Sequence, residues 1–83
     1  MTVRVLLPEH IRAARGLLNW TQADLADQAG LASTTIKRLE KQGTEKASLE
    51  NINKIISALE DAGIELLNDG RPGARLARAR SSS

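Results

Sequence analysis

Apolar residues recur at helical spacing early in the chain, where the sequence predicts a helix over about residues 8–18. Pro8 suits the first turn, because the N–H that proline lacks would have no partner there in any helix. Glu9 beside it places a negative charge at the positive end of the helix dipole. The inward stripe is expected to consist of Ile11, Ala14, Leu17 and Leu18.

Residues 21–42 have the pattern of two short helices joined by a tight turn. Thr21 can cap the first of them, since its hydroxyl can accept a hydrogen bond from the backbone N–H of Asp24. Gly30 ends this helix, because glycine adopts the left-handed backbone conformation without a steric penalty. A second short helix follows and is expected to end at about Gln42.

The last helical pattern begins at Ser48, another capping residue, and ends at Gly63. Apolar residues recur along it at helical spacing, at Leu49, Ile52, Ile55, Ile56 and Leu59. The period then changes, and segments 64–67 and 74–78 flank a stretch rich in turn residues, which predicts two short strands in a hairpin. Residues 1–7 alternate loosely and suit either a short strand or a frayed terminus.

Composition narrows the class of protein. The chain has 83 residues, which suits one domain, and it contains no cysteine, so disulfides and thiolate zinc sites are excluded. We expect Trp20, the single aromatic residue, to pack between the first two helices. No apolar run approaches the roughly 20 residues that span a bilayer. The N-terminus lacks the features of a signal peptide.

Charge is unevenly distributed along the chain, although the net charge is only +2. Basic and acidic residues are nearly balanced as far as Asn68, whereas in residues 69–83 Asp69 is the single acid. The basic residues of that segment are Arg71, Arg75, Arg78 and Arg80. This arginine-rich tail is either a solvated segment or one that contacts phosphate or another anionic partner.

Nothing in the sequence points to catalysis. His10 stands alone beside Glu9 on an early helical turn and is expected at the surface. It has no serine and aspartate in the arrangement of a catalytic triad, and no glycine-rich loop between a strand and a helix suggests a phosphate cradle. We therefore expect neither an enzyme nor a bound cofactor, metal ion or small-molecule substrate.

The two short helices within residues 21–42 have the features of a unit that reads DNA. Helices joined by a tight turn cross steeply, so the first needs a small residue at the crossing, which Ala26 supplies. The hydrophobic underside is formed by Leu25, Leu31, Ile36 and Leu39. The outward face of the second helix is polar and positively charged, and it can enter the major groove, which admits one α-helix. This face consists of Ser33, Thr34, Lys37, Arg38 and Lys41.

In these residues the chain resembles the Cro/phage-repressor type of helix-turn-helix protein, also called Xre-like. The matching positions are Arg15, Thr21, Gln22, Leu25, Ala26, Ala29, Gly30, Leu31, Ile36, Leu39, Glu40 and Gly43, followed by a fourth helix rich in Leu and Ile. The resemblance implies a mainly α fold, a repressor-type bundle of four or five helices, to which the short C-terminal β-hairpin or strand is added. It also implies binding to double-stranded DNA, usually by dimers on palindromic sites.

The resemblance places individual residues in roles. The base-contacting positions are Ser33, Thr34, Lys37 and Arg38. Family members often have glutamine or asparagine there, so the operator sequence stays open. The positions expected to contact the DNA backbone are Thr21, Gln22, Lys41, Thr44 and Lys46. Arg15 and Glu40 match a structural pair that orients the recognition helix without reading DNA.

These features predict a DNA-binding domain over residues 1–63, a hairpin for dimerisation or a basic tail over 64–80, and a disordered end over 81–83. The expected protein is a cytoplasmic, nucleoid-associated transcriptional regulator of a bacterium or phage, a repressor that binds a palindromic operator as a homodimer. The alternative is an antitoxin that binds a toxin and its own promoter. A third interpretation is a helical scaffold that does not bind DNA.

Overall fold

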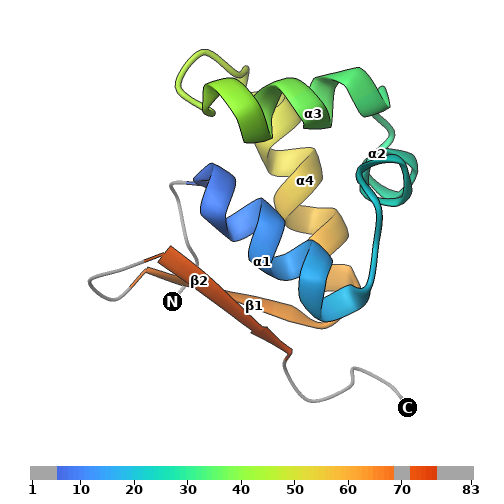
Figure 1. Cartoon of the computed structure of the whole chain (residues 1–83), viewed down its shortest axis with the longest axis vertical. Coiled ribbons are helices and arrows are strands. Elements are labelled where there is room, and N and C mark those ends of the chain that lie inside the picture. The colour runs from blue at the N-terminus through green and yellow to red at the C-terminus, as the bar shows by residue number, and fades with distance from the viewer. Residues whose placement is uncertain (1–5, 69–71, 77–83) are drawn as a thin grey trace.

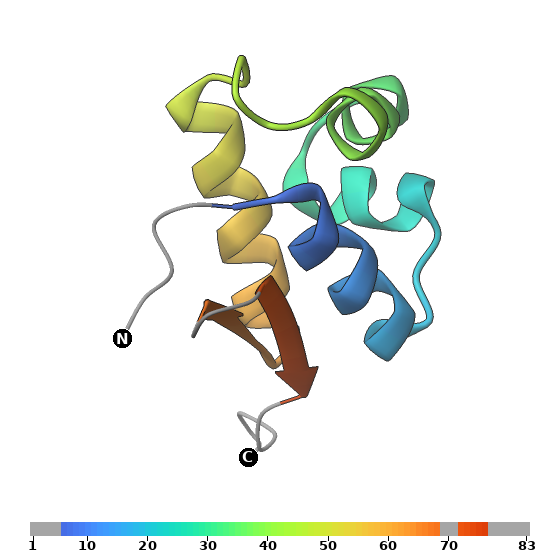
Figure 2. The same ribbon diagram turned by 60° about the vertical axis from the view of Figure 1, so that its left-hand side comes forward.

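Four helices and a C-terminal hairpin make up the described part of the chain, which in this computed structural model comprises residues 6–68 and 72–76. The elements are α1 (Pro8–Leu18), α2 (Gln22–Ala29), α3 (Ser33–Gln42), α4 (Leu49–Asp61), β1 (Ile64–Asn68) and β2 (Pro72–Leu76). Figure 1 and Figure 2 show α3 at one end of the molecule and the hairpin at the other, with α1 between them. The predicted fold class is confirmed, with four helices followed by a two-stranded hairpin.

Local hydrogen bonds set the boundaries of the helices. The Thr21 hydroxyl accepts from the Asp24 N–H at 3.0 Å, and the Asp24 carboxylate accepts from the Thr21 N–H at 2.9 Å, which makes a reciprocal capping box. The Ser48 hydroxyl caps α4 by accepting from the Asn51 N–H at 3.1 Å. Gly30 ends α2 with φ 72°, in the left-handed region. All three predicted capping positions are therefore confirmed.

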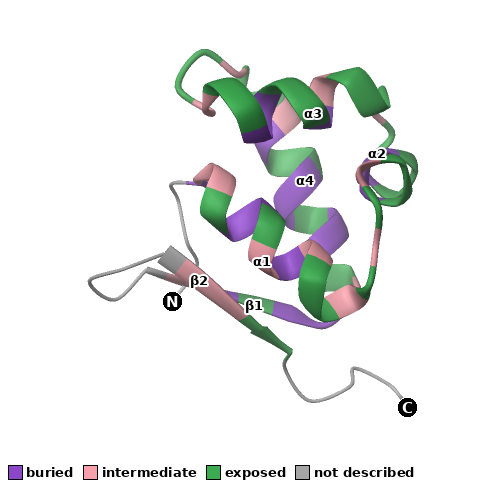
Figure 3. Ribbon diagram, in the orientation of Figure 1, coloured by how far each residue is buried: buried purple, intermediate pink, exposed green. Residues whose placement is uncertain are grey.

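The core lies where the helices face one another and the hairpin, and Figure 3 shows the buried residues on these inward sides. The largest fully buried side chains are Ile11, Leu25, Ile36, Ile55, Leu59 and His10. All but His10 are residues that helical spacing places inside. Leu17, which the spacing also places inside, is 46% exposed, so that prediction is wrong. Trp20 is partly buried and packs against the core, as predicted.

The hairpin covers one end of this core. β1 and β2 pair antiparallel, with Ile64 opposite Leu76, and the inner face of the hairpin packs on α1 and α4. Ile64 and Leu66 are buried there, which gives the two strands the support that an isolated hairpin in water lacks. On the other face, Arg75 Nε donates to Glu65 Oε1 at 2.8 Å, and this hydrogen bond and the carboxylate charge raise the pKa of Arg75.

The turn of the hairpin is shorter than the sequence predicts. Pairing continues to Asn68 and Pro72, so only residues 69–71 lie between the strands. Proline is acceptable at this place because the first residue of a strand can lack the ladder N–H. The run of turn residues therefore predicted the position of the hairpin correctly but predicted too long a loop.

His10 is buried, and its predicted surface position is wrong. The residue has 0% exposure. Its Nδ1 lies 3.0 Å from the Leu7 backbone nitrogen, and its Nε2 lies 2.8 Å from the Leu67 carbonyl oxygen. Because both ring nitrogens have main-chain partners, the ring can be buried without leaving a polar atom unpaired.

Some predictions concern residues outside the described part. These are the alternation over residues 1–5, the contacts of Arg71, Arg78 and Arg80, and the disorder of residues 81–83. Among the described residues, no helix has the length and apolar character needed to cross a membrane.

Candidate nucleic-acid interface

The outward face of α3 is polar along its whole length. Ser33, Thr34, Lys37, Arg38 and Lys41 are exposed, whereas Ile36, Leu39 and Glu40 are buried on the opposite side. Figure 3 shows this exposed surface running along the outer side of α3. The four residues predicted to contact bases are thus brought together on one face, at the end of the molecule remote from the hairpin. Whether they contact bases stays a prediction.

The turn between α2 and α3 is held by backbone hydrogen bonds. The Leu31 N–H donates to the Ala26 carbonyl at 2.8 Å, and the Gly30 N–H donates to the Asp27 carbonyl at 3.3 Å. This pair of bonds is the Schellman arrangement, which satisfies the last carbonyls of a helix and reverses its direction. Leu31 also packs against the core beside the turn. The turn therefore sets the direction of α3 relative to α2.

A network of hydrogen bonds around Glu40 holds α3 against α1 and α2. Arg15 Nε donates to Glu40 Oε2 at 2.7 Å, and Arg15 Nη2 donates to Glu40 Oε1 at 2.9 Å. Gln22 Nε2 also donates to Oε1, at 3.2 Å. The remaining Arg15 nitrogen, Nη1, donates to the Trp20 carbonyl at 3.0 Å. We call Arg15, Gln22 and Glu40 the bracing triad.

The bracing triad is a fixed, largely desolvated arrangement. The Glu40 side chain is 6% exposed and that of Arg15 is 21% exposed. Two parallel N–H···O bonds between a guanidinium and a carboxylate give both strength and a defined orientation. Since its members belong to α1, α2 and α3, the triad ties the exposed face of α3 to the rest of the fold. The contact expected from the resemblance is present, and its role in orienting α3 stays a prediction.

One further bond to α3 has no counterpart in the sequence-based expectations. Arg12 Nη1 donates to the backbone carbonyl of Glu40 at 2.8 Å, although the residue is largely exposed. It therefore binds one of the last carbonyls of α3, where a positive charge also opposes the negative end of the helix dipole. The signal that could have found it is the spacing of Arg12 and Arg15, which places both guanidiniums on the same side of α1.

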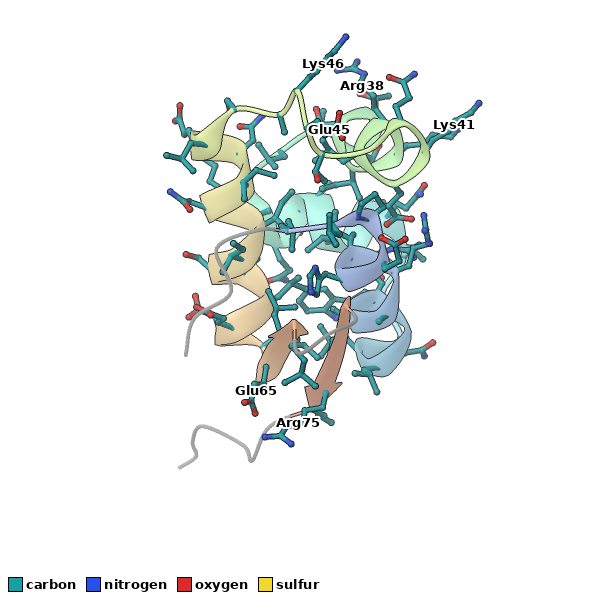
Figure 4. The ribbon with its side chains drawn as sticks, turned by 90° about the vertical axis from the view of Figure 1, so that its left-hand side faces the viewer. Arg38, Lys41, Glu45, Lys46, Glu65 and Arg75 are labelled. Carbon is teal, nitrogen blue, oxygen red and sulfur yellow. The ribbon has the colours of Figure 1, made fainter. Side chains whose placement is uncertain are left out.

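The loop of residues 43–48 extends the basic surface beyond α3. Figure 4 shows Arg38, Lys41 and Lys46 projecting from the same end of the molecule, with Glu45 among them. A hollow of about 480 Å³ lies between the second half of α3, this loop and the start of α4, and Arg38 and Lys46 both line it. Two positive charges thus border a depression that the acidic Glu45 also lines, and the exposed cations can contact a phosphate backbone.

The five residues predicted to contact the DNA backbone differ in which side-chain groups remain free to bind it. Lys41 and Lys46 are exposed. The Thr21 hydroxyl accepts from Asp24, so its hydrogen can still be donated. The Thr44 hydroxyl donates to the Leu6 carbonyl and can therefore only accept from another group. Their contact with DNA, and that of Gln22 beside the bracing triad, stays a prediction.

The described residues offer no metal centre. No group of three or more His, Cys, Asp or Glu side chains in residues 6–68 and 72–76 could hold a metal ion.

Comparison with known proteins supports the same conclusion as the geometry. No curated protein matches the chain. Residues 11–62 match the helix-turn-helix family HTH_3, and this segment runs from α1 to the end of α4 and contains both the bracing triad and the exposed face of α3. The match spans more than half of the 83 residues, and the family is DNA-binding and not catalytic. The chain therefore belongs to the HTH_3 family of Xre/Cro-type helix-turn-helix proteins and binds DNA.

Proposed function

We propose that the protein is a transcriptional repressor that binds a palindromic operator in double-stranded DNA as a homodimer, with α3 in the major groove. The observation that carries this proposal is the face of α3, which is polar and basic on the outside while its inner side is buried and braced. A helix fixed in this way can present side chains to base edges without reorganising. Occlusion of a promoter by the bound dimer is then sufficient for repression, in the cytoplasm where the nucleoid lies.

Sequence preference would come from the exposed side chains of α3. Arg38 can donate two hydrogen bonds to the O6 and N7 of guanine, worth about 1–3 kcal/mol of discrimination against another base. Ser33 and Thr34 lie in the first turn and carry hydroxyls that can donate or accept, so they select less strongly. Lys37, one turn further along the same face, can reach a base or a phosphate.

Backbone contacts would set the register of the protein on DNA. Lys41 and Lys46 supply charge at the end of the recognition helix and in the loop after it, and Thr21 and Gln22 supply polar groups at the start of α2. Thr44 lies in the same loop as Lys46, but its hydroxyl donates to the Leu6 carbonyl and a phosphate offers no donor, so this proposal assigns its side chain no phosphate contact. The backbone contacts of the other four residues hold the helix in the groove without carrying sequence information.

A dimer would place two copies of α3 about 34 Å apart, one turn of the DNA helix. The side of the hairpin is the candidate interface, because only copies that meet side by side there can present both α3 helices to the same face of the DNA. Leu76 at the end of β2 is 56% exposed, and Leu17 in the last turn of α1, the helix on which β2 packs, is 46% exposed. Covering two large apolar side chains is a favourable contribution to association. No small-molecule effector is part of this proposal.

The dimer interface can be tested by placing a charge on it. We expect Leu76→Glu to shift the protein towards a monomer in light scattering and to weaken binding to a palindromic duplex about tenfold or more, because each half-site then binds alone. Leu49→Glu is the control for the mass, since Leu49 is 73% exposed and lies at the start of α4, the end of that helix away from the hairpin. An unchanged mass for Leu76→Glu would contradict the assignment of the side of the hairpin to dimerisation.

The second candidate function is an antitoxin that binds a toxin through the hairpin and its own promoter through α3. The observation that favours it is the same exposed Leu76 on a short strand, since an extended segment of a partner can add to a strand edge. A toxin gene next to the gene for this chain, and a stable complex when the two are coexpressed, would support this function. Both candidate functions require DNA binding.

The test of the main proposal is selection of bound duplexes from a random DNA pool by the purified protein at near-physiological salt. An enriched palindrome is the expected result, and it also identifies the operator. An enriched single half-site would contradict the dimer. No retained DNA even at low salt would contradict DNA binding altogether and would leave the third interpretation, a helical scaffold.

Arg38→Ala is expected to remove sequence preference at one position of the operator, at a cost of about 1–3 kcal/mol there, while non-specific affinity changes little. Lys54→Ala provides a control, because Lys54 lies on α4 and its charge pairs with Glu50 at 3.6 Å. The measurement is the affinity for the selected operator and for single-base variants of it. Uniform weakening on every sequence would show that Arg38 contacts phosphate instead of a base.

A further inference from the structure

We propose that His10 is a positioning residue for DNA binding, which links the hairpin to the loop of residues 43–48 through the peptide group between Leu6 and Leu7. The inference rests on the proposed contact of that loop with the DNA backbone. It assigns a role to a buried polar side chain that neither the recognition helix nor the bracing triad uses. The link is a continuous series of three hydrogen bonds, described in order below.

The first two bonds fix the tautomer of His10. The Leu7 N–H can only donate, so Nδ1 at 3.0 Å must accept. The Leu67 carbonyl can only accept, so Nε2 at 2.8 Å must donate. His10 is therefore a neutral imidazole with its proton on Nε2, and with 0% exposure it has no water as an alternative partner. Its ring connects β1 to the first turn of α1.

The third bond starts from the same peptide group. The N–H of Leu7 and the carbonyl of Leu6 belong to one planar unit and point in opposite directions. The Leu6 carbonyl accepts from the Thr44 hydroxyl. Because the unit is rigid, a rotation that moves its N–H away from His10 also turns its carbonyl away from Thr44. His10 and Thr44 thus hold the same peptide group, His10 through its N–H and Thr44 through its carbonyl.

The two ends of this series lie in segments that have different proposed functions. At one end, Leu67 belongs to the hairpin, the element proposed for dimerisation. At the other, Thr44 follows α3 by two residues, in the loop that carries Lys46 and borders the hollow shared with Arg38. The Leu6 side chain is 2% exposed, so it also fixes this peptide group to the core. A hairpin displaced from α1 would break the His10–Leu67 bond and so remove one of the two side-chain bonds that hold the Leu6–Leu7 peptide group.

Variants of His10 and Thr44 separate this role from plain stability. His10→Phe fills the space but can neither accept from Leu7 nor donate to Leu67, whereas His10→Gln can do both through its amide. Thr44→Val removes the hydroxyl at constant shape. Ile56→Val is the stability control, because Ile56 is a buried α4 residue that takes part in none of the three bonds.

The measurement is the affinity of each full-length variant for a fluorescently labelled duplex of mixed sequence at low salt, well below the melting temperature. Binding to such a duplex depends on phosphate contacts, which the loop is proposed to make. We expect His10→Phe and Thr44→Val each to bind about 3- to 10-fold more weakly. The double variant should be no weaker than the weaker single variant, since both interrupt one series. His10→Gln and Ile56→Val should bind like the wild type.

Backbone amide chemical shifts measured without DNA provide the second readout. In His10→Phe the amides of residues 43–48 should move, together with those of Leu7 and Leu67. If His10→Phe does not fold, Thr44→Val should move the amides of Leu7 and Leu67 from the other end. Shifts confined to the immediate neighbours of the replaced residue would overturn the link.

The outcomes distinguish this inference from the proposed function. A wild type that does not bind the duplex would contradict DNA binding, and the amide shifts would then decide the link by themselves. A wild type that binds, with His10→Phe binding equally well, would overturn the positioning role while leaving the proposed function intact. Additive effects of His10→Phe and Thr44→Val would also overturn it, because independent sites add.

Discussion

Glu40→Ala is expected to lower the free energy of unfolding by about 3 kcal/mol and to abolish specific DNA binding. The substitution removes the acceptor of two Arg15 bonds and of the Gln22 bond, and it leaves a guanidinium without its counter-charge. A pair broken in the interior costs about 3–5 kcal/mol, and the lower value applies because the Arg15 side chain is 21% exposed and can recover some hydration.

The effect is large relative to the stability of so small a protein. For 83 residues, native stabilities of about 0.05–0.15 kcal/mol per residue give roughly 4–12 kcal/mol in total. Glu40→Ala would therefore remove a quarter or more of it. The molecules that remain folded would lack the bracing triad between α3 and the helices α1 and α2. Their recognition helix would therefore no longer be held in the orientation that enters the groove.

Urea unfolding followed by circular dichroism measures the stability loss, and operator affinity measures the functional one. Glu50→Ala is the matched control, because the Glu50 side chain is 77% exposed and its ion pair with Lys54 at 3.6 Å is open to solvent. Exposed pairs of this kind contribute about 0–1 kcal/mol. Equal unfolding midpoints for Glu40→Ala and Glu50→Ala would show that the bracing triad adds nothing to the fold.

Leu25→Ala is expected to destabilise the protein by about 2–5 kcal/mol, the range for truncating a leucine in a close-packed core. Leu25 has 0% exposure and lies in the middle of α2, in the core that α2 shares with α3. The truncation leaves a cavity under the helix-turn-helix, where the surrounding side chains can collapse only in part. DNA affinity should fall with the folded fraction and recover on cooling.

The same chemical change at an exposed site is the control for this prediction. Leu49 is 73% exposed, so Leu49→Ala should alter the free energy of unfolding by no more than about 0.5 kcal/mol. Thermal unfolding of the two variants side by side compares the burial of the two leucines directly. If both variants melt at the same temperature, Leu25 is not a core residue and the packing of α2 on α3 is different from the one described.

Helices and caps were predictable because they depend on residues close in sequence. The Thr21–Asp24 capping box, the Ser48 cap and the left-handed Gly30 each follow from groups no more than a few residues apart. Periodicity also identified Ile36 and Leu39 as the inner side of α3, and so left its polar residues outside. The exposed face of the candidate site could thus be derived from spacing alone.

Contacts between distant polar groups were not predictable in this way. The Arg15–Glu40 pair was expected only from the resemblance to a known family, and the bond from Arg12 to the Glu40 carbonyl was not expected at all. The position of His10 was wrong because its neighbour Glu9 and its polarity both favour the surface. A helical pattern indicates which side of a helix faces inward. It does not indicate whether a hydrogen-bond partner for a buried histidine ring lies on that side.

By itself, then, the sequence determined the elements of this protein, most of the apolar residues in its core, and the basic outer face of its recognition helix. These depend on side-chain volume, polarity and backbone preference over a few residues, which the chain carries wherever it folds. Only the tertiary structure decided that His10 meets Leu67, 57 residues away, and that Thr44 meets Leu6, 38 residues away. Such bonds form because packing of the apolar faces brings particular main-chain groups together, and any buried polar group must then find its partner among them.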